Sequence, residues 1–103
     1  TGLSMGGLAT WQLVALYPGR FAAAAPICGW LSGVPLPADL NGQKIWGVHG
    51  TADDAVPYED GLGAITAAKI AGADVKWDKV EGGGHDVWTR TYSRDDFWTW
   101  LTS

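Results

Sequence analysis

Ser4 lies at the centre of the segment Gly2-Leu3-Ser4-Met5-Gly6, which fits the pattern G-x-S-x-G. In this pattern a strand turns so sharply into a helix that glycine is required two residues before and two residues after the serine. The turn exposes the hydroxyl, and the start of the helix directs the backbone N–H of Met5 toward a reacting carbonyl. In a chain with 15 glycines the pattern also arises by chance, and the alternative is then a Gly-rich helix cap without chemistry. The segment therefore predicts a serine nucleophile with Met5 as an oxyanion donor, or an ordinary N-cap.

A serine nucleophile requires two further side chains, because its hydroxyl needs a histidine base and the histidine needs a carboxylate partner. Asp53 follows an apolar run at residues 45–49, and His85 follows a run that ends near Val80. Where this serine turn is used, the acid and then the histidine follow the serine along the chain. Both order and placement match, so we expect Asp53 and His85 to complete a triad with Ser4. Asp54 is the alternative acid, and its other interpretation is a solvated loop residue.

Several segments resemble one family. Residues 49–57, His-Gly-Thr-Ala-Asp-Asp-Ala-Val-Pro, are similar to the acid loop of the dienelactone hydrolase, carboxylesterase and prolyl-oligopeptidase-like branch of the α/β-hydrolases. Gly84-His85-Asp86 resembles the histidine loop of that branch, and Ser4-Met5-Gly6-Gly7 and Tyr17-Pro18-Gly19-Arg20-Phe21 are typical of it. The resemblance implies an α/β-hydrolase fold in which Asp53 is the triad acid.

The resemblance covers the whole chain as the C-terminal part of that fold. We therefore expect residues 1–103 to form a partial α/β-hydrolase domain that runs from the nucleophile turn to a C-terminal helix. The chain opens with Thr1 rather than methionine, and the resemblance implies a missing N-terminal half that holds the strand of the nucleophile and the loop with the second oxyanion N–H. That half is an expected partner, and without it we expect the chain to associate and to be impaired in activity.

The hydrophobic pattern predicts three helices. Apolar residues within 8–16 recur at steps of two to three positions, which predicts a mostly buried helix. The Ala-rich segment 60–71 is followed by a glycine, a typical helix terminator. Ser93 is expected to cap a last helix that extends through Leu101.

Strands are predicted between these helices. The apolar runs at residues 21–27 and 45–49 indicate buried strands, and the alternating run at 75–80 indicates a strand with one more polar face. Residues 33–42 are rich in Gly, Pro and Asn and are expected to form a loop. This alternation of helices and strands predicts an α/β fold with a parallel sheet flanked by helices.

Three further side chains have two interpretations each. Trp30 follows a predicted strand end, where ligands of open α/β sheets collect, and Trp88 follows His85 by three positions. Both are candidates for substrate binding, and the alternative for each is packing in the core. His49 closes a predicted strand, so we expect it to be scaffold, with contact to substrate as the alternative.

A metal site is the first competing hypothesis, because His49, Asp53, Asp54, His85 and Asp86 have side chains that bind divalent ions. The spacing argues against it, since there is no His-x-x-x-His or Glu-flanked pair, and a metal would leave the serine turn unexplained. We expect no metal and no organic cofactor. The remaining role for Asp86 is an exposed loop residue.

Composition excludes several classes. The chain is 47% hydrophobic and 17% charged, which is typical of a folded protein. Its net charge is −4 and its seven Lys and Arg are scattered, so nucleic acid is not an expected partner. No apolar run reaches the ~20 residues that span a bilayer. A single cysteine, Cys28, allows no internal disulfide and leaves the compartment undetermined.

The triad candidates and the resemblance together predict a serine hydrolase that cleaves small-molecule carboxylic esters through an acyl-enzyme. The same triad serves peptide hydrolysis, so a serine peptidase of the prolyl-oligopeptidase-like type is an alternative. A non-catalytic module that keeps the fold is another, because fold does not guarantee function.

Overall fold

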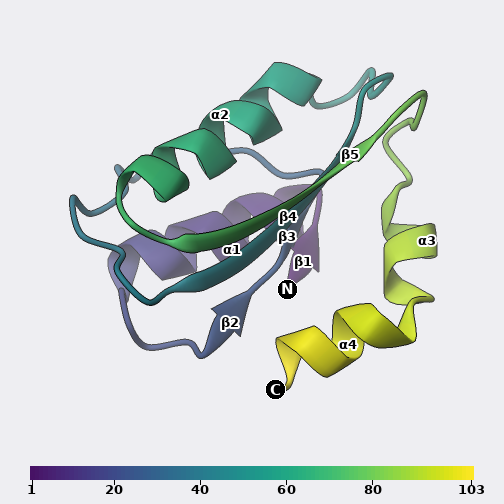
Figure 1. The fold of residues 1–103 in the computed structure, drawn as a ribbon. Coiled ribbons are helices and arrows are strands. Elements are labelled where there is room, and N and C mark those ends of the chain that lie inside the picture. The colour runs from purple at the N-terminus through teal and green to yellow at the C-terminus, as the bar shows by residue number, and fades with distance from the viewer.

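One β-sheet lies between two layers of helices in the computed structural model, which describes residues 1–103 (Figure 1). Every strand pair is parallel, which confirms the predicted fold class. The strands are β1 (Gly2–Leu3), β2 (Ala23–Ala24), β3 (Pro26–Ile27), β4 (Lys44–Gly50) and β5 (Asp74–Val80). The helices are α1 (Met5–Leu16), α2 (Tyr58–Ile70), α3 (Trp88–Tyr92) and α4 (Asp95–Leu101). None of these helices is long and apolar enough to cross a membrane.

β4 is the central strand of the sheet. It pairs with β2 near its start and with β3 further along, because β2 and β3 follow one path that is interrupted at Ala25. β5 pairs with the whole of β4 on the other side, and β1 pairs with β3. Parallel strands end at the same edge of a sheet, so the segments that follow β1, β4 and β5 can meet there.

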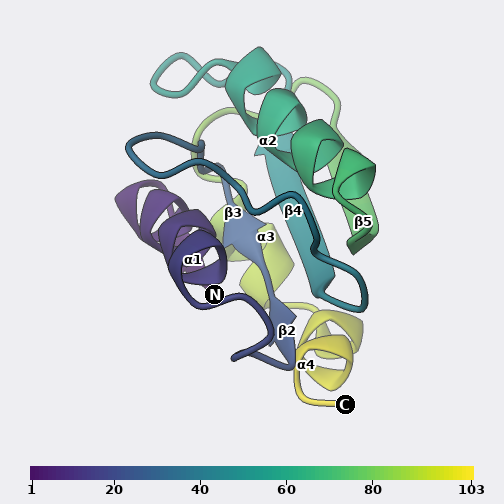
Figure 2. The ribbon, with the colours of Figure 1, turned by 90° about the vertical axis from the view of Figure 1, so that its left-hand side faces the viewer.

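Each face of the sheet has its own core. Helices α1 and α2 cover one face, and α3 and α4 cover the other (Figures 1 and 2). The first core consists of Trp11, Val14, Ala24, Leu40, Ile45, Ala64, Ile65, Ala68 and Ala73. The second consists of Ala25, Ile27, Cys28, Trp46, Val48, Val87 and Phe97.

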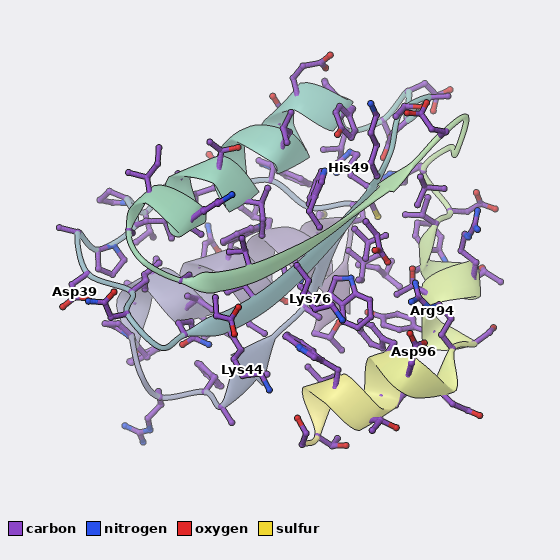
Figure 3. The ribbon with its side chains drawn as sticks, viewed as in Figure 1. Asp39, Lys44, His49, Lys76, Arg94 and Asp96 are labelled. Atoms are coloured by element: carbon purple, nitrogen blue, oxygen red, sulfur yellow. The ribbon has the colours of Figure 1, made fainter.

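Side chains of β4 alternate between these two cores, as the period of two in a strand requires. Ile45 packs under α1 and α2, whereas Trp46 packs against aromatic rings of α4. Val48 again belongs to the α4 side. His49, at the end of the strand, therefore points to the α2 side, where Figure 3 shows it between the sheet and that helix.

Two predicted elements differ in the structure. The helix expected to be mostly buried has one exposed face, because only one side of α1 meets the sheet: Leu13 is 44% and Leu16 55% exposed. The single strand expected at residues 21–27 is two short strands. Pro26 has no backbone N–H to contribute to a ladder, so the pairing breaks just before it.

The C-terminal region also differs from the prediction. Helix α3 was not expected, and Ser93 lies at its C-terminal end instead of capping α4. The hydroxyl of Ser93 donates to the carbonyl of Thr89 at 2.7 Å, a bond to the preceding turn that competes with capping. Arg94 is the residue that precedes α4.

Candidate active site

Ser4 occupies a strained turn between β1 and α1. Its backbone has φ 55° and ψ −116°, a left-handed φ that non-glycine residues rarely adopt. A bond of 2.9 Å from the N–H of Ser4 to the carbonyl of Ile27 ties the turn to β3. Ser4 stands at the N-cap position of α1, but its side chain makes no capping hydrogen bond. The hydroxyl is therefore not used as a helix cap.

Of the two glycines expected to be required around Ser4, only Gly2 is sterically required. A Cβ on Gly2 would overlap the backbone of Gly6, so the turn requires glycine at position 2. A Cβ on Gly6 would meet nothing within 4 Å, so the expectation of a steric requirement there is wrong for these residues. Gly7 is the second glycine under constraint, because a Cβ on it would lie 2.8 Å from the Cα of Gly29. This close approach sets α1 directly against the chain that leaves β3.

His85 bridges the other two triad candidates. Its Nδ1 lies 2.8 Å from Oδ2 of Asp53, and its Nε2 lies 2.8 Å from Oγ of Ser4. A carboxylate oxygen only accepts, so in the neutral ring Nδ1 carries the proton and donates to Asp53. Nε2 is then the acceptor for the Ser4 hydroxyl. The three side chains thus form one continuous hydrogen-bonded chain across segments that are far apart in sequence.

Asp53 is held by the loop in which it lies. Its Oδ1 accepts hydrogen bonds from the backbone N–H groups of Ala55 at 2.9 Å and Val56 at 2.8 Å, while Oδ2 accepts from His85. The side chain of Asp53 is fully shielded from solvent. Burial raises the pKa of this carboxyl, but the hydrogen bonds from His85, Val56 and Ala55 outweigh it, so the pKa lies below its ordinary value. Asp53 is therefore an anion at neutral pH.

The loops after β4 and β5 are bonded to each other. The N–H of Thr51 donates to the carbonyl of Val80 at 3.0 Å, and that of Ala52 donates to Gly83 at 2.9 Å. In return, Gly82 donates its N–H to Oγ1 of Thr51 at 2.8 Å. Gly50 lies so close to this second loop that a Cβ on it would overlap the backbone of Gly83. These contacts explain why Asp53 and His85, on separate loops, lie within hydrogen-bonding distance.

The other candidate residues are Asp54, Asp86, Trp88 and Trp30, and they differ in whether they contact the triad. Asp54 and Asp86 are exposed, and Asp54 makes no bond to His85. Trp88 packs edge-on against His85, with ring centroids 5.4 Å apart and planes at 90°. Trp30 lines a cavity of about 500 Å³ between the loop after β3 and α2, and neither Ser4 nor His85 borders that cavity.

Two buried groups lie next to the site. Cys28 is fully buried, and burial is the main cause that raises the pKa of its thiol to about 11. His49 is also fully buried, and its Nε2 lies 2.8 Å from the carbonyl of Val56 and 3.4 Å from Oδ2 of Asp53. The sequence indicated a scaffold role for His49, but no sequence signal indicated that its ring contacts the loop of Asp53.

Nowhere in residues 1–103 do three or more His, Cys, Asp or Glu side chains come together in an arrangement that could hold a metal ion. α1 begins at Met5, and the first N–H groups of a helix have no partner within it. The N–H of Met5 can thus bind an anion that forms next to Ser4.

The parallel sheet between two helix layers, with a strained strand-to-helix turn at Ser4, belongs to an α/β-hydrolase fold, which solved structures of esterases share. No family model matches the chain. Carboxylesterase SOBER1 of Arabidopsis thaliana is 29% identical over a match that covers 94% of this chain and 45% of that protein. The chain thus spans less than half the length of this relative.

Solved structures of esterases are also similar to this chain. The crystal structure of a thermostable esterase is similar with a TM-score of 0.85 and 32% identity, over 98% of this chain and 29% of that one. A carboxylesterase from Mesorhizobium loti is similar with a TM-score of 0.73 and 28% identity, over 84% of this chain and 41% of that one. Both matches agree with the sequence relationship to a carboxylesterase.

Proposed function

We propose that this chain carries the triad of a serine hydrolase that cleaves carboxylic esters through an acyl-enzyme. The observation that carries the proposal is the position of His85, whose two ring nitrogens each lie 2.8 Å from a triad partner, Asp53 Oδ2 and Ser4 Oγ. This is the geometry that a nucleophile, a base and an orienting acid need. Ser4 is the nucleophile, His85 the general base and Asp53 the orienting acid.

Acylation begins with proton transfer. Nε2 of His85 takes the proton of Ser4 as Oγ bonds to the ester carbonyl carbon, and the anionic Asp53 stabilises the imidazolium that results. The carbonyl electron pair moves to its oxygen, which the backbone N–H of Met5 helps to stabilise. The carbonyl then reforms, the bond to the alkoxy group breaks, and His85 gives its proton to the departing alcohol.

Deacylation repeats these steps with water. His85, again neutral, takes a proton from a water molecule whose oxygen bonds to the acyl carbon. The bond to Ser4 Oγ breaks as the carbonyl reforms, and the proton on His85 returns to Oγ. The carboxylic acid leaves and the free enzyme is restored. No organic cofactor or metal is required at any of these steps.

The ester is preferred to the peptide bond because the similar proteins with 28–32% identity are named esterases or carboxylesterases. We propose small-molecule esters as substrates. Trp88 is the better supported of the two substrate-binding candidates, because its ring contacts His85. Trp30 would act at the more distant cavity beside α2, where it could contact a longer substrate.

We also propose that residues 1–103 are one part of a single α/β-hydrolase domain and that activity needs residues outside them. Two observations support this. The chain spans 45% of the length of SOBER1. Moreover, α1 exposes apolar side chains on the side away from the sheet, with Met5 74% and Leu16 55% exposed, and these suit contact with further protein.

The test is covalent labelling of Ser4 in the longest form of the protein that its reading frame encodes. The protein is incubated with a fluorophosphonate probe, followed by intact mass measurement and peptide mapping. We expect one adduct, on Ser4, and none in the His85→Ala variant. Ser4→Ala and His85→Ala should lower kcat on a simple ester by roughly 10⁴- to 10⁶-fold. A well-folded protein without an adduct would instead support the non-catalytic module.

A further inference from the structure

We infer that His49 is a positioning residue that holds the loop of Asp53 so that its carboxylate faces His85. The inference rests on the proposed function, since it assigns a task within that triad. His49 is the last but one residue of β4, four positions before Asp53, and its side chain has no exposed surface. It does not touch the Ser4 hydroxyl, and it acts through Asp53.

The contacts of His49 show which of its ring nitrogens donates to the loop. Nε2 lies 2.8 Å from the carbonyl oxygen of Val56, which can only accept, so Nε2 carries a proton and donates it. Nδ1 is buried and has no hydrogen-bond partner. Of the two ring nitrogens, Nε2 is therefore the one that directs an N–H at the loop of Asp53.

This ring N–H completes a set of bonds around Asp53. Val56 accepts from His49 through its carbonyl and donates its own N–H to Oδ1 of Asp53 at 2.8 Å. Val56 is only 7% exposed. Without His49, its carbonyl would therefore lose its hydrogen-bond partner at a position that water reaches poorly. The turn of the chain between Asp53 and Val56 is thus fastened to β4 through one side chain.

Nε2 of His49 also lies close to the carboxylate of Asp53. Oδ2 of Asp53, the oxygen that accepts from His85, lies 3.4 Å from Nε2 of His49. The hydrogen bond of His49 goes to the carbonyl of Val56. That bond holds the loop whose N–H groups bind Oδ1 of Asp53, and so it keeps Oδ2 pointed at His85.

The ring of His49 is itself fixed, as a positioning role requires. It stacks against Trp77 at a centroid distance of 6.5 Å and meets Tyr58 edge-on at 6.0 Å. Nε1 of Trp77 donates to the hydroxyl of Tyr58 at 3.1 Å, which locks the two rings together. On the remaining side α2 approaches so closely that a Cβ on Gly61 would overlap Nδ1. Figure 3 shows His49 between the sheet and α2.

Two amide substitutions at His49 test whether its side-chain N–H has to reach the carbonyl of Val56. In His49→Gln the side-chain N–H reaches about as far as Nε2, whereas in His49→Asn the same amide is one methylene shorter and cannot reach Val56. We expect His49→Asn to lower kcat about 10- to 100-fold with KM changed less than about twofold, because a small displacement of a catalytic group costs this much. His49→Gln should retain kcat within about threefold of the parent. Melting temperatures show whether both variants are folded.

A second readout does not depend on hydrolysis. The proton shared between His85 Nδ1 and Asp53 gives a downfield ¹H NMR resonance, which should persist in His49→Gln and be lost in a folded His49→Asn. Persistence of the resonance and of kcat in His49→Asn would overturn the inference. The resonance can be measured even if Ser4 proves unreactive. Labelling of Ser4 therefore tests the proposed function, and the resonance in His49→Asn tests the inference.

The wild-type protein supplies a measurement that needs no variant to fold. Long-range ¹H–¹⁵N correlation spectra report the tautomer of each histidine. We expect His49 to be protonated at Nε2 and unprotonated at Nδ1. The opposite tautomer would remove the donor to Val56, and the inference with it.

Discussion

Oδ2 of Asp53 lies 2.8 Å from Nδ1 of His85, although the two residues stand 32 positions apart in the chain. Neighbouring Asp54 is exposed and makes no such contact. Two adjacent aspartates with the same chemistry thus have different surroundings, because the loop after β4 directs one inward and the other into solvent. This difference makes them a matched pair for testing the role of the acid.

We expect Asp53→Asn to lower kcat by about 10⁴-fold, because the amide cannot stabilise the imidazolium and permits the wrong tautomer of His85. Asp54→Asn should leave kcat within about twofold of the parent. Steady-state kinetics on a chromogenic ester measures both. Equal losses in the two variants, or a larger loss in Asp54→Asn, would contradict the assignment of the acid.

The hydrogen bonds to Asp53 also predict how stability depends on pH. The pKa of this carboxyl is lower in the folded protein than its ordinary value of about 3.9, so the folded state binds the proton less tightly than the unfolded state. The ionised group therefore stabilises the fold above about pH 4. That contribution is lost as the pH falls from there through the lowered pKa.

Urea unfolding of the parent and of Asp53→Asn at several pH values between about 6 and 2.5 measures this effect. We expect the difference in unfolding free energy between the two proteins to shrink as the pH falls below about 4. A difference that stays constant over this range would show that the carboxylate is not preferentially stabilised in the folded state.

Two helical glycines should respond to alanine with opposite signs. Gly7 of α1 lies against Gly29, so the added methyl group of Gly7→Ala forces α1 away from the sheet. This substitution should destabilise the protein by about 1–3 kcal/mol. Gly63 of α2 is exposed and a Cβ there meets nothing within 4 Å. Gly63→Ala should stabilise by about 0.5–1 kcal/mol, because alanine is the better helix former. Thermal and urea denaturation of both variants provide the comparison.

The packing of α4 rests on Phe97, which has no exposed surface and contacts Trp46 with ring centroids 5.4 Å apart. Phe97→Ala should lower the free energy of unfolding by about 3–5 kcal/mol through lost burial and a cavity. Thr99 lies on the exposed side of the same helix, and Thr99→Ala should change stability by less than about 0.5 kcal/mol. Similar effects of the two substitutions in urea unfolding would mean that α4 is not packed against the sheet.

The central elements were predictable because their signals are local. The apolar run at residues 45–49 lies within β4, and the Ala-rich segment 60–71 overlaps α2 almost completely. A continuous apolar run, or an Ala-rich segment that a glycine ends, marks such an element whatever the rest of the chain does. The short elements were less predictable: α3 has five residues, and the break between β2 and β3 depends on pairing with β4.

The chemical types and order of the site candidates were also readable from the sequence by itself. A glycine-flanked serine, an aspartate after one strand and a histidine after the next are local features, and they predict Ser4, Asp53 and His85 without coordinates. The parallel α/β class follows from the alternation of elements in the same way.

Only the tertiary structure decided the contacts between those segments. It brings Asp53 rather than Asp54 to His85, leaves one face of α1 exposed, and directs the ring of His49 at the loop of Asp53. Each of these outcomes depends on distances between side chains on different strands and helices. Local pattern carries no information about such distances, because they are set by how the helices pack on the two faces of the sheet.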